Sequence, residues 1–196
     1  MNALPEPRPT LILASASPRR RELLAQLGWD FSVQVPDVDE QALGEGIDDP
    51  NTLVRVLASA KASAIAKHYP EALVIGADTV VVCGAEILGK PTDTADAIRM
   101  LRALQGTTHA VITGISVWHQ GRNITVAEST TVTFAPMMPE AIAAYVASGE
   151  PMDKAGAYAI QGLASQWVVG ITGCYFNVVG LPLHRLCTSV STLLTH

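Results

Sequence analysis

The chain has 196 residues, of which 48% are apolar and 16% are charged, a composition that can fill a sizeable core and excludes a disordered chain. Its net charge of −5 argues against general nucleic-acid coating, which depends on many phosphate contacts. The sequence also has no uncharged apolar run of the about 18 residues that a membrane span requires, so we expect none.

The cysteines indicate a reducing compartment. Cys83, Cys174 and Cys187 are odd in number and lack CxxC spacing, so we interpret them as reduced thiols. The five histidines show no metal-ligand pattern, and the first ten residues lack the apolar core of a signal peptide. These features predict a cytoplasmic protein that binds neither nucleic acid nor membranes.

The first half of the chain alternates between strand and helix patterns. Residues 1–9 contain three prolines and are expected to form a flexible lead-in, followed by a single domain over 10–196. Serine or aspartate followed by proline marks two helix starts. The predicted strands are Leu11–Ala14, Phe31–Val35 and Leu73–Val82, and the predicted helices run from Ser17 to Gly28 and from Asp49 to Lys67.

The second half continues this alternation and adds a hairpin. A turn is predicted at Cys83–Glu86 and a hairpin turn at Gln120–Arg122. The remaining predicted helices are Thr92–Leu104, Pro139–Ser148 and Leu181–Leu194, and the remaining strands are Ala110–Trp118, Asn123–Phe134 and Trp167–Ile171. This order predicts an α/β protein with a mixed sheet covered by helices.

A cationic segment separates the first strand from the first helix. Ser15 and Ser17 are followed by Arg19, Arg20 and Arg21, at a helix start where backbone N–H groups point outward. Guanidinium groups match phosphate oxygens well, whereas cations at a helix N-terminus are otherwise slightly unfavourable. We therefore favour a phosphate site over a merely solvated first turn. The glycines and the GK[ST] ending of a P-loop are absent.

Asp78 interrupts the long apolar strand, with Thr79 beside it. An unpaired carboxylate in such surroundings costs several kcal/mol, so Asp78 must meet a cation, a metal or hydrogen-bond donors. Its position on a rigid strand suits a general base or a metal ligand. The alternative is a structural ion pair with an arginine.

An acidic segment, Asp37 to Glu40, follows the second strand. Hard oxygen ligands of this kind hold Mg²⁺ or Mn²⁺, although an acidic loop is commonly just solvated. Val38 interrupts the run, and Asp39 and Glu40 would point in opposite directions in an extended chain. At most one or two carboxylates can therefore converge, and we favour Glu40.

Two lysines and one amide complete the candidates. Lys61 lies beside an apolar stripe of its helix formed by Leu53, Leu57, Ala60 and Ala64 and could reach a cleft edge, although taken alone it fits a surface lysine. Lys90, between glycine and proline, is a candidate phosphate contact. Gln161 lies among small residues, and its amide offers a donor and an acceptor that complement the N3–H and O4 edge of uracil or thymine.

Taken together these motifs resemble the Maf family, over residues 10 to 187. The resemblance rests on LASASPRRRELLAQLG, VDE, ASAKASA, GADTVV, LGKP, DKAGAYAIQG and NVVGLPL, which occur in that order. It implies a fold like that of inosine triphosphate pyrophosphatases, with an elongated mixed sheet flanked by helices and two lobes around a central cleft. It also implies cleavage of the α–β phosphoanhydride of a nucleoside triphosphate, with a divalent cation, and a homodimer.

The resemblance assigns roles residue by residue. Asp78 matches the family's proton acceptor and, with Glu40, a position for the metal. Arg19, Thr79 and Gln161 match positions for base selectivity. Polar cleft positions thought to hold phosphates or metal are matched by Ser15, Ser17, Arg20, Glu40, Lys61 and Lys90. Cys174 stands where relatives often carry serine.

DKAGAYAIQG resembles the branch of the family that acts on dTTP and UTP. The branch that acts on 7-methyl-GTP tends to show a CAGS-type segment, with glutamate in place of Gln161. Three alternatives stay open from the sequence. The first is a nucleotide-binding regulator of cell division or septum formation, and the second is a pyrophosphatase of different base preference, such as 7-methyl-GTP. The third is a house-cleaning enzyme for modified pyrimidine triphosphates such as 5-methyl-UTP or pseudo-UTP.

Overall fold

The computed structural model describes residues 9–195. Its strands form one mixed sheet in the order β2-β1-β3-β5-β6-β7, with β4 paired to β3. β1 runs parallel to β2 and β3, whereas β4 is antiparallel to β3 and β7 is antiparallel to β6. The strands are β1 Leu11–Ala14, β2 Ser32–Gln34, β3 Leu73–Cys83, β4 Glu86–Leu88, β5 Thr108–His119, β6 Arg122–Phe134 and β7 Val168–Thr172. The predicted mixed α/β class is confirmed.

The chain forms two compact units. Unit 1 comprises the chain up to Asp78, Thr113–Glu128 and the chain from Gly180 onward. Unit 2 comprises Thr79–Ile112 and Ser129–Val179. Strands β3, β5 and β6 therefore contribute residues to both units. The single domain over 10–196 and the central cleft between two lobes stay predictions, and the predicted lead-in lies, except for Pro9, outside the described residues.

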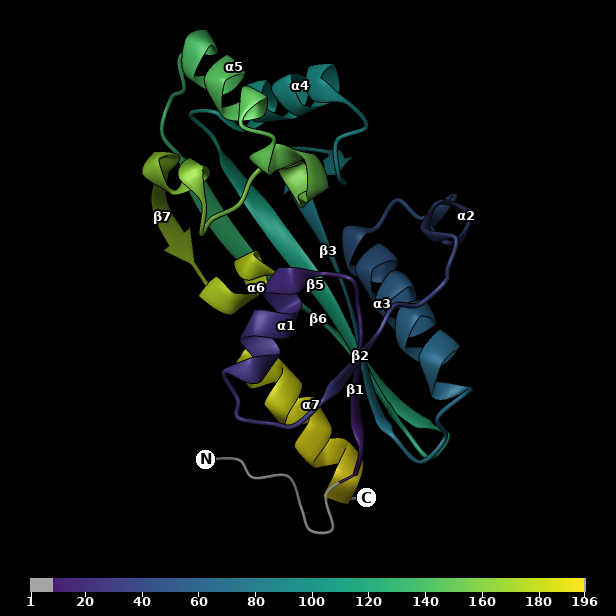
Figure 1. Ribbon diagram of the computed structural model, residues 1–196. Coiled ribbons are helices and arrows are strands. Elements are labelled where there is room, and N and C mark those ends of the chain that lie inside the picture. Colours follow the sequence, from purple (N-terminus) through teal and green to yellow (C-terminus); the bar gives the residue numbers. More distant parts are fainter. Residues whose placement is uncertain (1–8, 196) are drawn as a thin grey trace. The chain divides into compact units, whose positions relative to one another are not determined.

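In unit 1 the buried strand β1 lies between β2 and β3, with helices on both sides of these strands (Figure 1). Every residue of β1 is buried, as expected for a central parallel strand. Figure 1 shows α3 on one side of these strands and α1 and α7 on the other. Ser17 caps α1 and Asp49 caps α3, as their sequence positions predict. The helices are α1 Pro18–Ala25, α2 Glu40–Gly44, α3 Pro50–Ala66 and α7 Leu183–Thr195.

Two glycines bring α3 into backbone contact with the sheet. A Cβ at Gly76 on β3 would lie 2.4 Å from the carbonyl oxygen of Ala58. A Cβ at Gly114 on β5 would lie 2.2 Å from that of Val54. The face of α3 that packs against these glycines differs from the apolar stripe predicted from the sequence. Of the predicted residues Leu53, Leu57, Ala60 and Ala64, only Leu57 is buried. The buried residues are Val54, Leu57, Ala58, Lys61 and Ala62.

Unit 2 contains a buried aromatic cluster. His109, Phe134 and Tyr158 meet edge to face with ring centroids 4.8–5.4 Å apart. His109 Nε2 and the Tyr158 hydroxyl are 2.8 Å apart, and burial lowers the pKa of His109 to about 4, so the imidazole is neutral at neutral pH. The helices of this unit are α4 Thr94–Leu104, α5 Pro139–Ala147, η1 Glu150–Asp153, η2 Ala155–Ala157, η3 Leu163–Trp167 and α6 Tyr175–Val179.

All longer predicted elements are present, and the ones that the sequence pattern missed are short. Helices α2 and α6 have five residues each and β4 has three, too few for a hydrophobic period to show. The turn predicted at Cys83–Glu86 joins β3 to β4, with Gly84 at a φ of 59°.

Two further expectations from the sequence concern the cysteines and membrane-spanning helices. The three cysteines are free thiols, as predicted. Within residues 9–195, none of the helices combines the length and the apolar character that a membrane crossing demands.

We expect Gly76→Ala to destabilise the fold by roughly 1–3 kcal/mol, because the added methyl would overpack the contact between β3 and α3. Denaturant unfolding at neutral pH measures this change. Gly170→Ala on β7 is the matched control, since a Cβ there meets nothing within 4 Å. Equal unfolding midpoints for the two variants would contradict the close packing of α3.

Candidate functional site in unit 1

The parallel pairing of β1, β2 and β3 brings three segments of unit 1 to one end of the sheet. Ala14, the last residue of β1, pairs with Gln34 of β2 and Gly76 of β3. The segments that begin at Ser15 and Val35, and Asp78 further along β3, therefore lie toward the carboxyl ends of these strands. That end is the usual place for a ligand site in a parallel α/β sheet.

A buried ion pair occupies this end. Lys61 Nζ lies 2.6 Å from Asp78 Oδ1, and the two residues are only 7% and 8% exposed. Glu40 reaches the same ammonium at 2.9 Å, with its side chain half exposed. Lys61 is thus in direct contact with Asp78, and the expectation that Lys61 taken alone would be a surface lysine is wrong. The reason is the rotation of α3, which turns Lys61 toward the sheet.

Asp39 and Glu40, two carboxylates of the acidic segment, make different contacts. Asp39 caps α2, because its Oδ1 accepts a hydrogen bond from Ala42 N at 3.0 Å. Glu40 is the first residue of α2 and extends to Lys61. Glu40, the carboxylate favoured from the sequence, thus converges with Asp78 on Lys61, and its role as a metal ligand stays a prediction.

The serine and arginine segment is ordered by its own hydrogen bonds. Ser15 is buried, and its Oγ accepts from Ser17 N at 3.1 Å. Ser17 Oγ accepts from Arg20 N at 3.5 Å as the cap of α1. The Arg20 side chain turns inward, where Nε donates to the carbonyl oxygen of Gly180 at 2.9 Å. The NVVGLPL motif thus supplies, through Gly180, a backbone contact that sequence analysis did not assign.

Arg20 belongs to the same electrostatic cluster as the ion pair. Burial lowers the pKa of its guanidinium, the carboxylate of Asp78 opposes that shift, Arg19 adds to it, and Glu40 opposes it. Cations and carboxylates from β3, α1, α2 and α3 therefore interact within unit 1.

The carboxylates offer a limited metal-binding set. Among residues 9–195, no group of three or more histidine, cysteine, aspartate or glutamate side chains could hold an ion. Glu40 and Asp78 converge on the single ammonium of Lys61. The two residues present hard carboxylate oxygens close to one another, a donor set that fits a divalent cation whose remaining ligands are water and substrate phosphates.

The other predicted site residues belong to unit 2. Thr79 is half-buried on β3, and Lys90 and Gln161 are exposed. Gly156 N donates to the carbonyl oxygen of Gly89 at 3.0 Å, which ties the loop of Lys90 to the segment that precedes Gln161.

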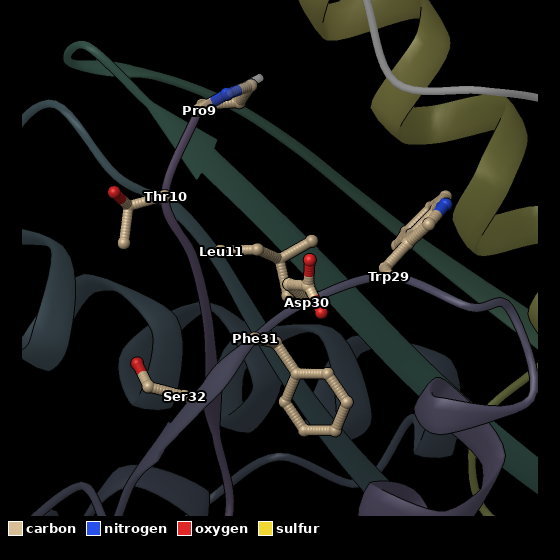
Figure 2. Close-up of a pocket in the computed structure, with 7 residues that line it drawn as sticks. All are labelled: Pro9, Thr10, Leu11, Trp29, Asp30, Phe31 and Ser32. Carbon is tan, nitrogen blue, oxygen red and sulfur yellow. The ribbon is translucent and has the colours of Figure 1, made fainter.

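The structure also contains a hollow that no predicted site residue lines. It measures roughly 410 Å³ and is lined by Pro9–Leu11, at the start of β1, and by Trp29–Ser32, at the start of β2 (Figure 2). The hollow lies at the amino ends of these strands, whereas Ser15 follows the carboxyl end of β1. It is therefore separate from the charged cluster of unit 1.

Solved structures define the class of the fold. Similarity extends to the Ham1 protein of Staphylococcus aureus, with a TM-score of 0.51, 13% identity, and coverage of 94% of this chain and 99% of that one. A HAM1 protein from Coxiella burnetii is similar with a TM-score of 0.50 and 16% identity, and the match covers 95% of this chain and 98% of that one. The fold is that of the inosine triphosphate pyrophosphatase and Ham1 proteins, as the sequence resemblance predicts.

The sequence defines the family more narrowly. The profile described as Maf-like protein matches residues 10–193, and the chain belongs to the Maf family. Similar curated proteins carry the name dTTP/UTP pyrophosphatase. The protein of Symbiobacterium thermophilum is 53% identical over 89% of each chain. That of Desulforamulus reducens is 50% identical over 92% of this chain and 94% of its own.

We expect Lys61→Met to lower the free energy of unfolding by roughly 1–3 kcal/mol, because it leaves the buried Asp78 carboxylate without the ammonium that contacts it. Adding Asp78→Asn should restore more than half of the loss, since the uncompensated charge is then removed. Denaturant unfolding of the double-mutant cycle measures both effects, with exposed Lys67→Met as the control. Additive losses would contradict the pairing.

Proposed function

We propose that this chain is a dTTP/UTP pyrophosphatase that hydrolyses the α–β phosphoanhydride to the nucleoside monophosphate and pyrophosphate. The observation that carries this proposal is the buried Asp78 carboxylate held by Lys61 and flanked by Arg20 and Glu40. Such a constellation combines a proton acceptor with cations for a polyphosphate. The names of relatives about half identical over nine-tenths of the chain support the choice of substrate.

In this mechanism Asp78 orients a water molecule and accepts its proton. The water oxygen attacks the α-phosphorus in line, and the bond from that phosphorus to the α–β bridging oxygen breaks. The bridging oxygen leaves with the electron pair as part of pyrophosphate. Lys61 holds Asp78 in place through the 2.6 Å contact, so the base does not depend on a mobile loop.

The cations and hydroxyls of unit 1 bind the phosphates. Ser15, Ser17, Arg20 and Lys61 supply donors or positive charge close to Asp78, and Lys90 of unit 2 is assigned the same role. Because phosphoryl transfer is governed by positioning and charge stabilisation, these groups stabilise the charge that develops on the leaving pyrophosphate.

Glu40 and Asp78 would hold a divalent cation, Mg²⁺ or Mn²⁺, together with phosphate oxygens of the substrate. Bound there, the ion would supply charge neutralisation and make water a better nucleophile. The donor chemistry of the two carboxylates supports this assignment. The homodimer and the cytoplasmic location implied earlier belong to the same proposal.

Base selectivity is assigned to Arg19, Thr79 and Gln161. The amide of Gln161 can accept from N3–H and donate to O4 of uracil or thymine. A bound base with a different edge would shield this amide from water and leave it unpaired, which disfavours that base by a few kcal/mol.

Pyrophosphate release from a panel of triphosphates tests the proposed function. The panel contains dTTP, UTP, CTP, 5-methyl-UTP, pseudo-UTP and 7-methyl-GTP, each with Mg²⁺, with Mn²⁺ and with a chelator. We expect turnover of dTTP and UTP that the chelator abolishes. Preference for 7-methyl-GTP, or nucleotide binding without pyrophosphate release, would overturn the proposal.

We predict that Asp78→Asn lowers kcat for UTP by about 10²- to 10⁴-fold, because an amide cannot accept the proton of the attacking water. The fold should persist, since Lys61 keeps its contact with Glu40. Steady-state kinetics with a parallel thermal unfolding curve measures both effects. Exposed Asp48→Asn is the control, and near-normal turnover by Asp78→Asn would remove the assignment.

We predict that Gln161→Glu lowers kcat/KM for UTP and dTTP by about 10- to 100-fold, because it removes the N–H donor from the base contact. The melting temperature should change little, because Gln161 is exposed. The same kinetics with CTP separates base recognition from general damage, and exposed Gln26→Glu serves as the control. Equal losses for every base would contradict the selectivity role.

A further inference from the structure

Within unit 2, the backbone around Gln161 is hydrogen-bonded to the side chains of Tyr145 and Glu150, to which no role has been assigned so far. We define the Gln161 segment as residues 157–163. Leu163 N donates to both carboxylate oxygens of Glu150, at 3.0 and 3.1 Å. Ala159 N donates to the hydroxyl oxygen of Tyr145 at 3.2 Å. The two anchored amides stand two residues before and two residues after Gln161.

The two anchors are themselves connected. The Tyr145 hydroxyl donates to Glu150 Oε1 at 2.9 Å, so one chain of hydrogen bonds runs from Ala159 through Tyr145 and Glu150 to Leu163. Burial raises the pKa of Tyr145, so its hydroxyl stays protonated and can donate and accept at once. A carboxylate that accepts several hydrogen bonds forms a stronger anchor than a neutral group.

Between the anchors the backbone closes a turn that exposes Gln161. Gly162 N donates to the carbonyl oxygen of Ala159 at 3.1 Å. Ala159 and Ile160 are buried, whereas Gln161 is exposed. A Cβ at Gly162 would lie 2.1 Å from Glu150 Oε1, so the carboxylate is packed directly against the glycine backbone. The glycine in DKAGAYAIQG thus makes room for Glu150.

Glu150 is also held through its own backbone. Lys154 Nζ donates to the carbonyl oxygen of Glu150 at 2.8 Å, and Glu150 N donates to Ser148 Oγ at 3.2 Å. Ser148 Oγ in turn donates to the carbonyl oxygen of Tyr145 at 2.6 Å. The carboxylate that anchors Leu163 therefore projects from an ordered connection between α5 and η1.

We infer that Glu150 and Tyr145 are positioning residues for base selection, acting through the orientation of the Gln161 amide. The inference rests on the proposed function and adds two specificity-determining residues to it. An amide distinguishes a uracil edge from a cytosine edge only if its donor and acceptor keep a fixed direction, because a freely turning amide could satisfy either base. The anchored amides on both sides of Gln161 fix the backbone from which its side chain projects, which limits the directions open to the side-chain amide.

The test compares kcat/KM for UTP and CTP in Glu150→Ala, Glu150→Gln and Tyr145→Phe, with exposed Glu140→Ala on α5 as the control. Glu150→Ala is expected to reduce the UTP-to-CTP ratio at least tenfold, mainly through a higher KM for UTP. Glu150→Gln retains one acceptor oxygen and should give an intermediate ratio. Tyr145→Phe should lower the ratio about threefold, and Glu140→Ala should leave it unchanged.

A double-mutant cycle with Gln161→Ala separates positioning from general support of the fold. In that background Glu150→Ala should no longer change the ratio, because the amide that it orients is absent. Amide hydrogen exchange of Ala159 and Leu163, expected to accelerate at least tenfold in Glu150→Ala, provides a readout that needs no substrate. If Glu150→Ala does not fold, Glu150→Gln and Tyr145→Phe carry the same comparison.

The outcomes distinguish this inference from the function on which it rests. A wild-type chain that releases pyrophosphate from neither UTP nor dTTP overturns both. An active wild type overturns the inference alone if the variants slow UTP and CTP equally. The same conclusion follows if Glu150→Ala changes the ratio by the same factor with and without Gln161.

Discussion

The contact between the Lys61 ammonium and the Asp78 carboxylate is the interaction on which the site of unit 1 depends. Both side chains are almost fully buried, and a buried charge persists only beside a partner of opposite sign. The half-exposed Glu40 is a second carboxylate on the same ammonium, so two negative charges face the single positive charge of Lys61. Arg20 offsets part of that excess. The result is a rigid, charged cluster in an otherwise apolar part of the sheet.

The backbone around this pair is arranged so that a long side chain can be buried. Gly76 and Gly114 allow α3 to approach β3 and β5 at backbone distance. That approach brings Lys61 to Asp78 and leaves little freedom for either side chain. A carboxylate on a strand, oriented by a lysine on a closely packed helix, keeps its direction without help from a loop.

Unit 2 uses a related device for a backbone segment. There the anchoring charge is the Glu150 carboxylate, which lies against Gly162 and accepts from the Leu163 amide. In unit 1 the glycines admit the backbone of α3, the helix that carries Lys61, and in unit 2 Gly162 admits the Glu150 carboxylate itself. The charged group then fixes the residue that is assigned a chemical role, Asp78 in one unit and Gln161 in the other.

The linear pattern was sufficient for the longer elements and for the unusual residues. The alternation of apolar runs and capped helices predicted the mixed α/β class, and the carboxylate of Asp78 inside an apolar strand predicted a buried charge. Both predictions were possible because periodicity and polarity are local properties of the sequence. Short elements such as α2 were not predicted, because five residues are too few to show a hydrophobic period. The burial of Lys61 and the anchoring by Glu150 were decided by tertiary structure alone. The rotation of α3 is set by glycines on two other strands, and the partner of Glu150 lies 13 residues further along the chain.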